Sequence, residues 1–395
     1  MRGWPIVFAA VLSIGAQNPV QNPVRNVDQL HRIRQKMAEI LERQPNYTCI
    51  QTIERSTQWT GSHTRMDDTL RLEVALVDGK ELFAWPGSKQ FEDHELRDLV
   101  STGMIGNGSF AIHARTIFLT DSASFAERGE TQLSGRPVLR YDFQVSRSHS
   151  NYRLRLNDHE AIVPFHGSFY ADPVTLDVRR MEVITDDIPA DLGISATETT
   201  VNYDRRRIGD EEFLLPVESG LMMAMPDVVN RNSVRLTSCR KFSGESTLTF
   251  DDPELANAST EGSATAPAKE VDLPAGLPLR LEFSELDLMH AAIGDTVRAT
   301  LRSNLKNGRE VLAPKGSIAH GRIMRLDRYN THFGLHIEFQ DLDWRGGHAR
   351  LKLRFEQTES LPGLITKART GPEILILRRA GPRLSGILMV WRMEQ

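Results

Sequence analysis

The sequence lacks long hydrophobic runs. After residue 17, no apolar stretch of this 395-residue chain approaches the roughly 18 residues that a membrane-spanning helix needs. We therefore expect no transmembrane helix after that point, and a protein that is peripheral to a membrane rather than spanning it.

An excess of one charge is also missing. The chain holds 48 basic and 52 acidic residues, for a formal net charge of −4. Proteins that bind nucleic acid usually carry a basic balance or a basic patch. The composition therefore predicts no nucleic-acid partner.

Familiar catalytic motifs are absent as well. The sequence contains no Gly-x-Ser-x-Gly nucleophile elbow, no phosphate-binding loop and no His-Glu-x-x-His zinc motif. It predicts no catalytic residues, no cofactor and no metal site, which favours a non-enzymatic protein. A secreted hydrolase with an unrecognised site is the alternative from another class.

The first sixteen residues have the layout of a secretory signal peptide. Arg2 supplies a positive start, residues 4–12 are almost continuously apolar, and residues 13–16 are mostly small. This is the order of charged region, short apolar region and cleavage site. We expect export to remove residues 1–16 and to leave a periplasmic or otherwise exported protein. A retained N-terminal anchor is the alternative, because Ile14 is larger than the residue usual at its position.

Cysteine is scarce, with Cys49 and Cys239 the two in the chain. In an exported protein, two cysteines favour one disulfide. Two buried free thiols are the alternative interpretation. A Cys49–Cys239 bond would close a loop of about 190 residues, for which chain entropy gives a gain of roughly 5 kcal/mol at most.

Helical periodicity follows the N-terminal region. Apolar residues recur at steps of three and four at Val27, Leu30, Ile33, Met37 and Leu41. This spacing predicts one long amphipathic helix. Asn26 is placed to cap its start, with Gln29 in the capping-box position.

From Tyr47 the apolar period changes to two. Segments 70–76, 139–145 and 152–156 alternate apolar with polar residues, as half-buried antiparallel strands do. Similar strands are expected up to about residue 250, with short helical pieces at 93–102 and 110–118.

Residues 251–275 break this pattern. They are rich in Ala, Ser, Thr, Glu and Pro and hold almost no large apolar side chains, so they cannot bury enough surface to fold alone. We interpret 251–275 as a linker between a domain at 26–250 and a second all-β domain at 276–395.

Aromatic residues of the first domain allow two interpretations. They can simply build its core. Alternatively, Trp59, Trp85, Phe110 and Phe169 line an apolar cavity between the sheet and its helix, which would suit a lipid or an apolar peptide segment.

The order of these elements resembles a known superfamily, the outer-membrane lipoprotein carrier and sorting proteins. Residues 167–182 (GSFYADPVTLDVRRME) are similar to that superfamily's strand–turn–strand, and residues 135–142 (GRPVLRYD) to the strand before it. Over 26–250 the resemblance implies a strongly curved antiparallel sheet wrapped around a helix. It also implies an apolar cavity and no catalytic residues.

The second domain resembles a different periplasmic module. Segments 273–281 (LPAGLPLRL), 292–299 (AIGDTVRA) and 311–322 (VLAPKGSIAHGR) are similar in succession to the small β-barrel of TrbI-type type IV secretion scaffold proteins. Proline fixes φ and glycine takes the left-handed position in such turns. The resemblance implies a small β-barrel that acts as a scaffold module.

These observations predict a mainly β (α+β) fold, with a curved antiparallel sheet, one long N-terminal helix and a second small β-barrel domain. They predict an exported envelope protein that binds a lipid, lipoprotein or apolar peptide segment in a curved-sheet cavity. A structural scaffold subunit of an envelope assembly, with an envelope protein as partner, is a further alternative.

Overall fold

The computed structural model of the chain describes residues 23–88, 91, 96–99, 112–157, 159–242, 269–329, 332–358, 364–366, 373–377, 383–384 and 386–394. The predicted signal peptide, residues 1–16, lies outside this part. Among the described residues, no helix is long and apolar enough to cross a membrane.

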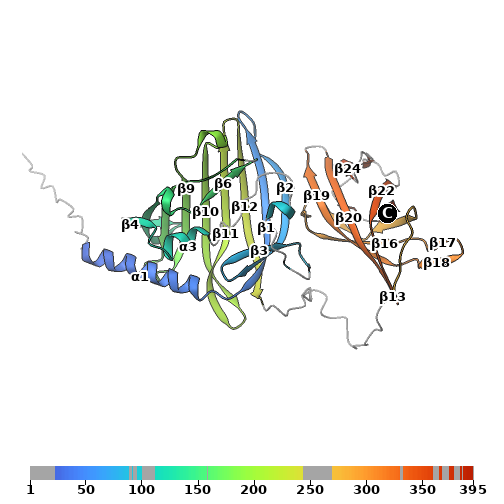
Figure 1. Ribbon diagram of the computed structural model, residues 1–395, viewed down its shortest axis with the longest axis horizontal. Helices are drawn as coiled ribbons and strands as arrows, with labels where there is room; N and C mark the ends of the chain where they lie inside the picture. Colours follow the sequence, from blue (N-terminus) through green and yellow to red (C-terminus); the bar gives the residue numbers. More distant parts are fainter. Residues whose placement is uncertain are drawn as a thin grey trace, which may run out of the picture.

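Two ten-stranded sheets organise the fold and lie next to each other along the long axis of the molecule (Figure 1). Every neighbouring pair in the first sheet is antiparallel. Its strands are, in spatial order, β3 (Lys80–Ala84), β2 (Arg65–Val77), β1 (Tyr47–Trp59), β12 (Val228–Lys241), β11 (Glu211–Met225), β10 (Ala196–Ile208), β9 (Val178–Thr185), β8 (Phe165–Ala171), β5 (Arg136–Val145) and β4 (Ala123–Leu133).

Helices cover one face of this sheet, which we call the inner face. They are α1 (Pro23–Glu42), α2 (Leu96–Leu99) and α3 (Ile112–Phe118), with 3-10 turns at Arg147–His149 and Ala190–Leu192. The stripe predicted from the sequence is confirmed, since Ile33, Met37 and Leu41 of α1 are buried. The helix begins at Pro23 rather than after Asn26, and proline suits a first helical turn because its missing N–H is not needed there.

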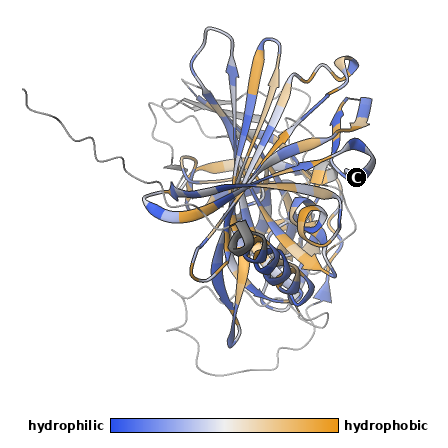
Figure 2. Ribbon diagram, turned by 90° about the vertical axis from the view of Figure 1, so that its left-hand side faces the viewer, coloured by the Kyte–Doolittle hydropathy of each residue, from blue (hydrophilic) through white to orange (hydrophobic). Residues whose placement is uncertain are grey.

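Strand alternation separates the core from solvent. In β8, Phe165 and Phe169 point inward and are buried, whereas His166 between them is exposed. The same change of hydrophilic and hydrophobic residues runs along the strands in Figure 2. Phe169 stacks on Tyr141 with ring centroids 5.2 Å apart and meets Phe118 of α3 edge-on. A small hairpin, β6 (Arg153–Leu156) with β7 (His159–Ile162), has its own cluster of buried apolar residues.

The second sheet is built mostly from antiparallel strands. Its order is β13 (Lys269–Glu270), β21 (Gly347–Arg350), β20 (His332–Trp344), β19 (Ile318–Arg328), β16 (Thr296–Leu301), β14 (Pro278–Phe283), β26 (Leu388–Met393) and β22 (Leu353–Thr358), with β24 (Glu373–Leu377) and β23 (Leu364–Thr366) added beside β20. Two short ribbons complete it, β15 (Leu286–Asp287) with β25 (Arg383–Leu384) and β17 (Leu305–Asn307) with β18 (Glu310–Ala313). Trp391 of β26 is fully buried and contacts Phe339 and Phe355 edge-on.

The predicted fold class is confirmed: the chain is mainly β, with a curved antiparallel sheet around one long helix and a second β unit. The second sheet begins at Lys269, inside the segment that the sequence predicted as a linker. The domain limits at 250 and 276, and the independence of the two units, stay predictions.

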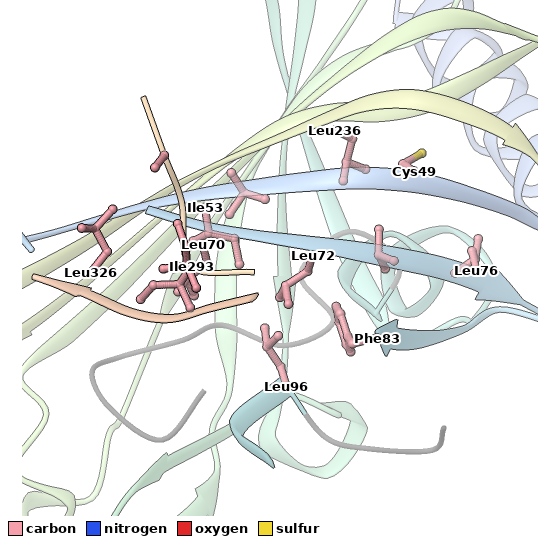
Figure 3. Packing of buried hydrophobic residues seen from close by; sticks show 14 of the residues in the cluster. Cys49, Ile53, Leu70, Leu72, Leu76, Phe83, Leu96, Leu236, Ile293 and Leu326 are labelled. Carbon is pink, nitrogen blue, oxygen red and sulfur yellow. The ribbon is translucent and has the colours of Figure 1, made fainter. Parts of the chain in front are cut away.

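Apolar packing continues from one sheet to the other. Leu70 of β2 lies beside Ile293 of the second unit, and Leu326 of β19 belongs to the same buried cluster (Figure 3). The two sheets therefore share a core at their contact.

Candidate functional site

The two cysteines are joined by a disulfide, as predicted. Cys49 of β1 and Cys239 of β12 lie on adjacent antiparallel strands, with their Cα atoms 4.1 Å apart. The bond sits where the β1–β12 register shifts between Thr48 and Ile50. It ties together β1 and β12, the third and fourth strands in the spatial order of the first sheet.

An apolar pocket lies between α1 and the inner face of the first sheet, and we call it the α1 pocket. Met37 and Leu41 of α1 form one wall, and strands from both halves of the sheet form the other. The apolar lining residues of the sheet are Val74, Leu76, Leu214, Pro216 and Leu236. Each arrives there through strand alternation, which sends every second side chain to the inner face.

Polar groups also line the α1 pocket: the hydroxyls of Tyr47 and Tyr203, the amide of Gln44 and the carboxylate of Glu81. The Gln44 amide donates a hydrogen bond to the Tyr47 hydroxyl oxygen at 3.4 Å. The Tyr203 hydroxyl is buried and has no hydrogen-bond partner within the described part of the chain. A buried donor without a partner costs roughly 1–3 kcal/mol, so native structures rarely leave one.

Both tyrosine hydroxyls keep their protons at neutral pH. Burial raises the pKa of each well above the ordinary value of a tyrosine, and the negative charge of Glu81 adds to this effect at Tyr47. The pocket therefore offers two neutral O–H donors beside the carboxylate of Glu81. This chemistry suits binding of a carbonyl or ester oxygen attached to an apolar chain.

The free volume of the α1 pocket is about 20 Å³, enough for about one water molecule. The pocket is closed in this conformation, and a chain-like ligand would need to displace part of α1.

One buried carboxylate fastens the middle of α1 to the sheet. Asp177 accepts hydrogen bonds from Arg205 at 2.8 and 2.9 Å, and the Lys36 ammonium of α1 lies 2.8 Å from it. Burial alone would raise the pKa of Asp177, but the hydrogen bonds and charges of Arg205 and Lys36 outweigh burial and hold the pKa below its ordinary value. Asp177 is therefore ionised and holds the helix by a charged contact.

The aromatic residues that the sequence assigned to a cavity lie in separate places. Phe169 is fully buried in the core beneath α3, and Trp59 ends β1 with 54% of its surface exposed. Trp85 follows β3 at the contact with the second sheet, where the Arg322 guanidinium lies 5.8 Å from its ring centroid. Phe110 lies outside the described residues.

Sequence reasoning missed the tyrosines of the α1 pocket. Tyr47 is the first residue of β1, and Tyr203 follows Val201 in the inward phase of β10. The inward phase of an alternating strand was the signal that could have found Tyr203.

A second cavity of about 300 Å³ lies at the contact between the sheets. Its lining is polar and includes the buried Arg55–Asp68 ion pair, Asn232, and Arg328 of β19. Opposite charges are paired inside this lining, so it contributes mainly to the contact between the two units.

Comparison with known proteins gives limited results. No model of a protein family and no curated protein matches the chain. Solved structures do show similarity, among them the following three. An outer membrane lipoprotein-sorting protein domain from Vibrio parahaemolyticus has 10% identity and a TM-score of 0.32, with coverage of 57% of this chain and 96% of that chain. A LolA superfamily protein from Nitrosomonas europaea has 10% identity and a TM-score of 0.27, with coverage of 54% and 93%. A DUF1329 family protein from Desulfovibrio piger has 11% identity and a TM-score of 0.30, with coverage of 60% and 100%.

These similarities agree in kind with the resemblance of the first domain to lipoprotein-sorting proteins. At such TM-scores they carry no argument about function, and the fold described above rests on its own strand pairing. None of the three is described as a type IV secretion scaffold, so the TrbI-type resemblance of the second domain stays a prediction.

Proposed function

We propose that the protein is an exported envelope protein that holds the apolar part of a lipid, a lipoprotein or an apolar peptide segment between α1 and the inner face of the first sheet. The observation that supports this most is the Tyr203 hydroxyl, a buried donor without a partner in the described chain, which lines an otherwise largely apolar pocket. A carbonyl oxygen of the ligand would accept its hydrogen bond.

Energetics favour a long apolar chain over a short one. Burial of Ile33, Met37 and Leu41 contributes roughly 2 kcal/mol for each side chain, about 6 kcal/mol for the three. A ligand that displaces this stripe must offset the loss, and each buried methylene group contributes about 0.8 kcal/mol. A chain of roughly eight or more methylene groups reaches that balance.

The experiment is a binding titration of the purified mature protein with a fluorescent long-chain fatty acid. We expect saturable binding, and we expect Tyr203→Phe to weaken it by about fivefold to tenfold, the worth of one net hydrogen bond. The variant removes an unpaired buried hydroxyl, so the fold should be as stable as before or more stable.

Tyr141→Phe is the matched control. Tyr141 is also buried on the inner face and its hydroxyl also lacks a partner in the described chain, but it packs on Phe169, outside the α1 pocket. Its removal should leave fatty-acid affinity unchanged. Absence of saturable binding, or equal effects of the two variants, would contradict the proposal.

Native mass spectrometry of protein purified from the periplasm distinguishes the possible occupants. A co-purifying acyl lipid and a co-purifying peptide have different masses and fragmentation. An intact Met1 in that protein would contradict export with cleavage, for which we expect a chain that begins near Gln17.

A further inference from the structure

The outer face of the first sheet carries three rows of side chains that run across the strands in register. The middle row comprises Glu54, Ser233, Gly220, Thr200, Glu182, Ser168, Asp142 and Ala126, each directly paired with the next. It crosses eight strands from β1 to β4, a distance of about 34 Å at the usual spacing of about 4.8 Å.

Around Gly220 the middle row has the shortest side chains of the three rows. Gly220 stands at the centre of the long strand β11, and a Cβ atom built there would meet nothing within 4 Å. Glycine inside a strand weakens it and often marks a place where another chain or a ligand approaches. Ser233 and Thr200 on either side of Gly220 are also short, so the floor of the sheet is open here.

Longer side chains flank this floor. One neighbouring row comprises Arg231, Met222, Glu198, Ile184, His166 and Gln144, and the other comprises Arg235, Glu218, Asn202, Arg180, Tyr170 and Arg140. Two cavities of about 400 and 790 Å³ lie along the floor. The two cavities adjoin each other. Glu198 and Thr200 line the smaller cavity, and they are the direct strand partners of Ile184 and Glu182, which line the larger one. We call the whole feature the outer groove.

The charge of the outer groove is acidic. Its rows and cavities hold five arginines and seven carboxylates: Arg128, Arg140, Arg180, Arg231 and Arg235 against Glu54, Asp142, Glu182, Asp186, Asp187, Glu198 and Glu218.

Most arginines of the groove are paired with carboxylates. Arg128 and Arg140 both bind Asp142, and Arg180 and Arg235 lie against Glu182 and Glu218. Arg231 donates to the neutral side chain of Gln58 instead. By contrast, the side chains of Glu198 and Asp187 have no hydrogen bond or ion pair within the described residues. Two carboxylates without a cationic partner thus face one arginine without a carboxylate partner, so the charge left over in the groove is negative.

From this geometry we infer that the outer groove binds an extended, positively charged peptide segment of a partner protein. Methionine surfaces at Met66 and Met222 accept the aliphatic stems of lysine or arginine, and Glu198 accepts the charged head. The groove length of about 34 Å matches about ten residues of extended chain. This site is on the face opposite the α1 pocket and does not depend on the function proposed for that pocket.

A glycan is the other extended polymer to consider, and the lining favours it less. Sugar rings commonly stack on free aromatic faces, but the rings of Phe125 and Phe143 in the lining pack edge-on against Phe169 and Phe165 of the core. Free carboxylates also give a neutral sugar no charge to pair with.

The experiment measures fluorescence anisotropy of a labelled ten-residue peptide of alternating lysine and alanine, titrated with the full mature protein at low salt. Its counterpart of glutamate and alanine and a neutral N-acetylglucosamine hexasaccharide serve as the competing ligands. We expect the lysine peptide alone to bind, and its affinity to fall as salt screens the charges.

Two variants locate the site. Gly220→Leu fills the open floor, where an added Cβ would meet nothing within 4 Å, and Glu198→Lys reverses the free charge. We expect each to weaken lysine-peptide binding by about tenfold or more, while Glu211→Lys, the same charge change on an exposed residue at the start of β11, leaves it unchanged. Melting temperatures establish that the variants are folded, and Glu198→Lys decides the matter should Gly220→Leu unfold.

Three results would overturn the inference: no binding of the lysine peptide, equal affinity in the groove variants and the wild type, or binding of the hexasaccharide in its place. Fatty-acid binding in the α1 pocket is measured separately, so failure of either idea leaves the other intact.

Discussion

Ile293 pairs with Leu70 in a parallel bridge and so covers part of the edge of β2. The Ile293 N–H donates to the Thr69 carbonyl at 2.8 Å, and the Arg71 N–H donates to the Ile293 carbonyl at 2.7 Å. Strand β3 pairs only with residues 73–77 of β2. The second unit thus satisfies backbone groups that an open sheet edge would expose to other chains.

Side chains from both units stabilise this bridge. Arg71 forms an ion pair with Asp295, and Arg328 donates to the Thr69 hydroxyl at 2.8 Å. Arg322 donates to the carbonyl of Pro86 at 3.0 Å and also to that of Gly294. The contact joins the units through backbone and charged groups, which predicts that they stay together when the connection between them is cut.

Gly294→Ala tests this contact. Gly294 has φ of +100°, and an added Cβ would lie 2.1 Å from the Arg71 carbonyl oxygen and 2.9 Å from the Trp85 ring. We expect the substitution to lower the free energy of unfolding by roughly 2–4 kcal/mol, from backbone strain together with the clash. Denaturant titration measures the change.

Gly308→Ala is its control, because Gly308 also has a positive φ but has nothing within 4 Å of an added Cβ. That variant should lose only about 1 kcal/mol. With a protease site engineered between residues 243 and 268, the cleaved wild type should elute as one species, and cleaved Gly294→Ala as two. Separation of the cleaved wild type would contradict this account of the contact and would show that the two units are independent.

The disulfide gives the next prediction. Replacing both Cys49 and Cys239 by alanine should lower the free energy of unfolding by about 2–5 kcal/mol, because the long loop between them is no longer closed in the unfolded chain. Denaturant titration under oxidising conditions measures it. Since Cys49 is buried, a reductant should act slowly on the folded protein, and equal stability of the double variant would contradict this account.

Acid should destabilise the protein through His113. This residue of α3 is buried against the rings of Tyr152 and Phe165, and burial lowers its pKa to about 4. The unfolded chain has a histidine pKa of about 6.5, so it takes up a proton first as the pH falls. The stability that His113 contributes is therefore complete above pH 6.5 and is lost between 6.5 and 4, by about 3 kcal/mol in total.

His113→Leu should flatten that part of the curve of unfolding free energy against pH. An unaltered slope in His113→Leu would mean that other groups cause the acid sensitivity.

Much of the fold could be predicted from the sequence because local periodicity reports the face of an element. The stripe from Ile33 to Leu41 and the alternation in residues 139–145 each matched an element of the expected kind. Strand β11 is harder to predict from local pattern, because Pro216 falls inside it and cannot donate a backbone hydrogen bond. The structure continues through that proline because the β10–β11 register shifts beside it, between Asn202 and Tyr203, and proline is tolerated at such bulges.

The sites were predictable to a smaller degree. Two cysteines in an exported chain are enough to predict a bond. The α1 pocket and the outer groove depend on which residues of distant strands become neighbours, as when Gly220 comes to lie between Ser233 and Thr200. That information is in the strand order and not in local pattern, so sequence periodicity could not supply it.

The last prediction concerns the attachment of α1. Lys36→Met keeps the apolar stem of the side chain but removes its charged contact with Asp177, which retains Arg205 as a partner. Because the Lys36 side chain is one-third exposed, we expect a loss of only about 1 kcal/mol in the attachment of the helix. A free-energy change of that size makes local opening about fivefold more frequent. Hydrogen exchange of the α1 amides should accelerate by that factor while exchange in β8 and β20 stays the same, and a fatty acid should enter the α1 pocket faster.

Lys306→Met, the same change on an exposed strand of the second unit, should alter neither rate. If exchange in α1 is unchanged, or rises equally throughout the protein, the ion pair does not hold the helix against the sheet.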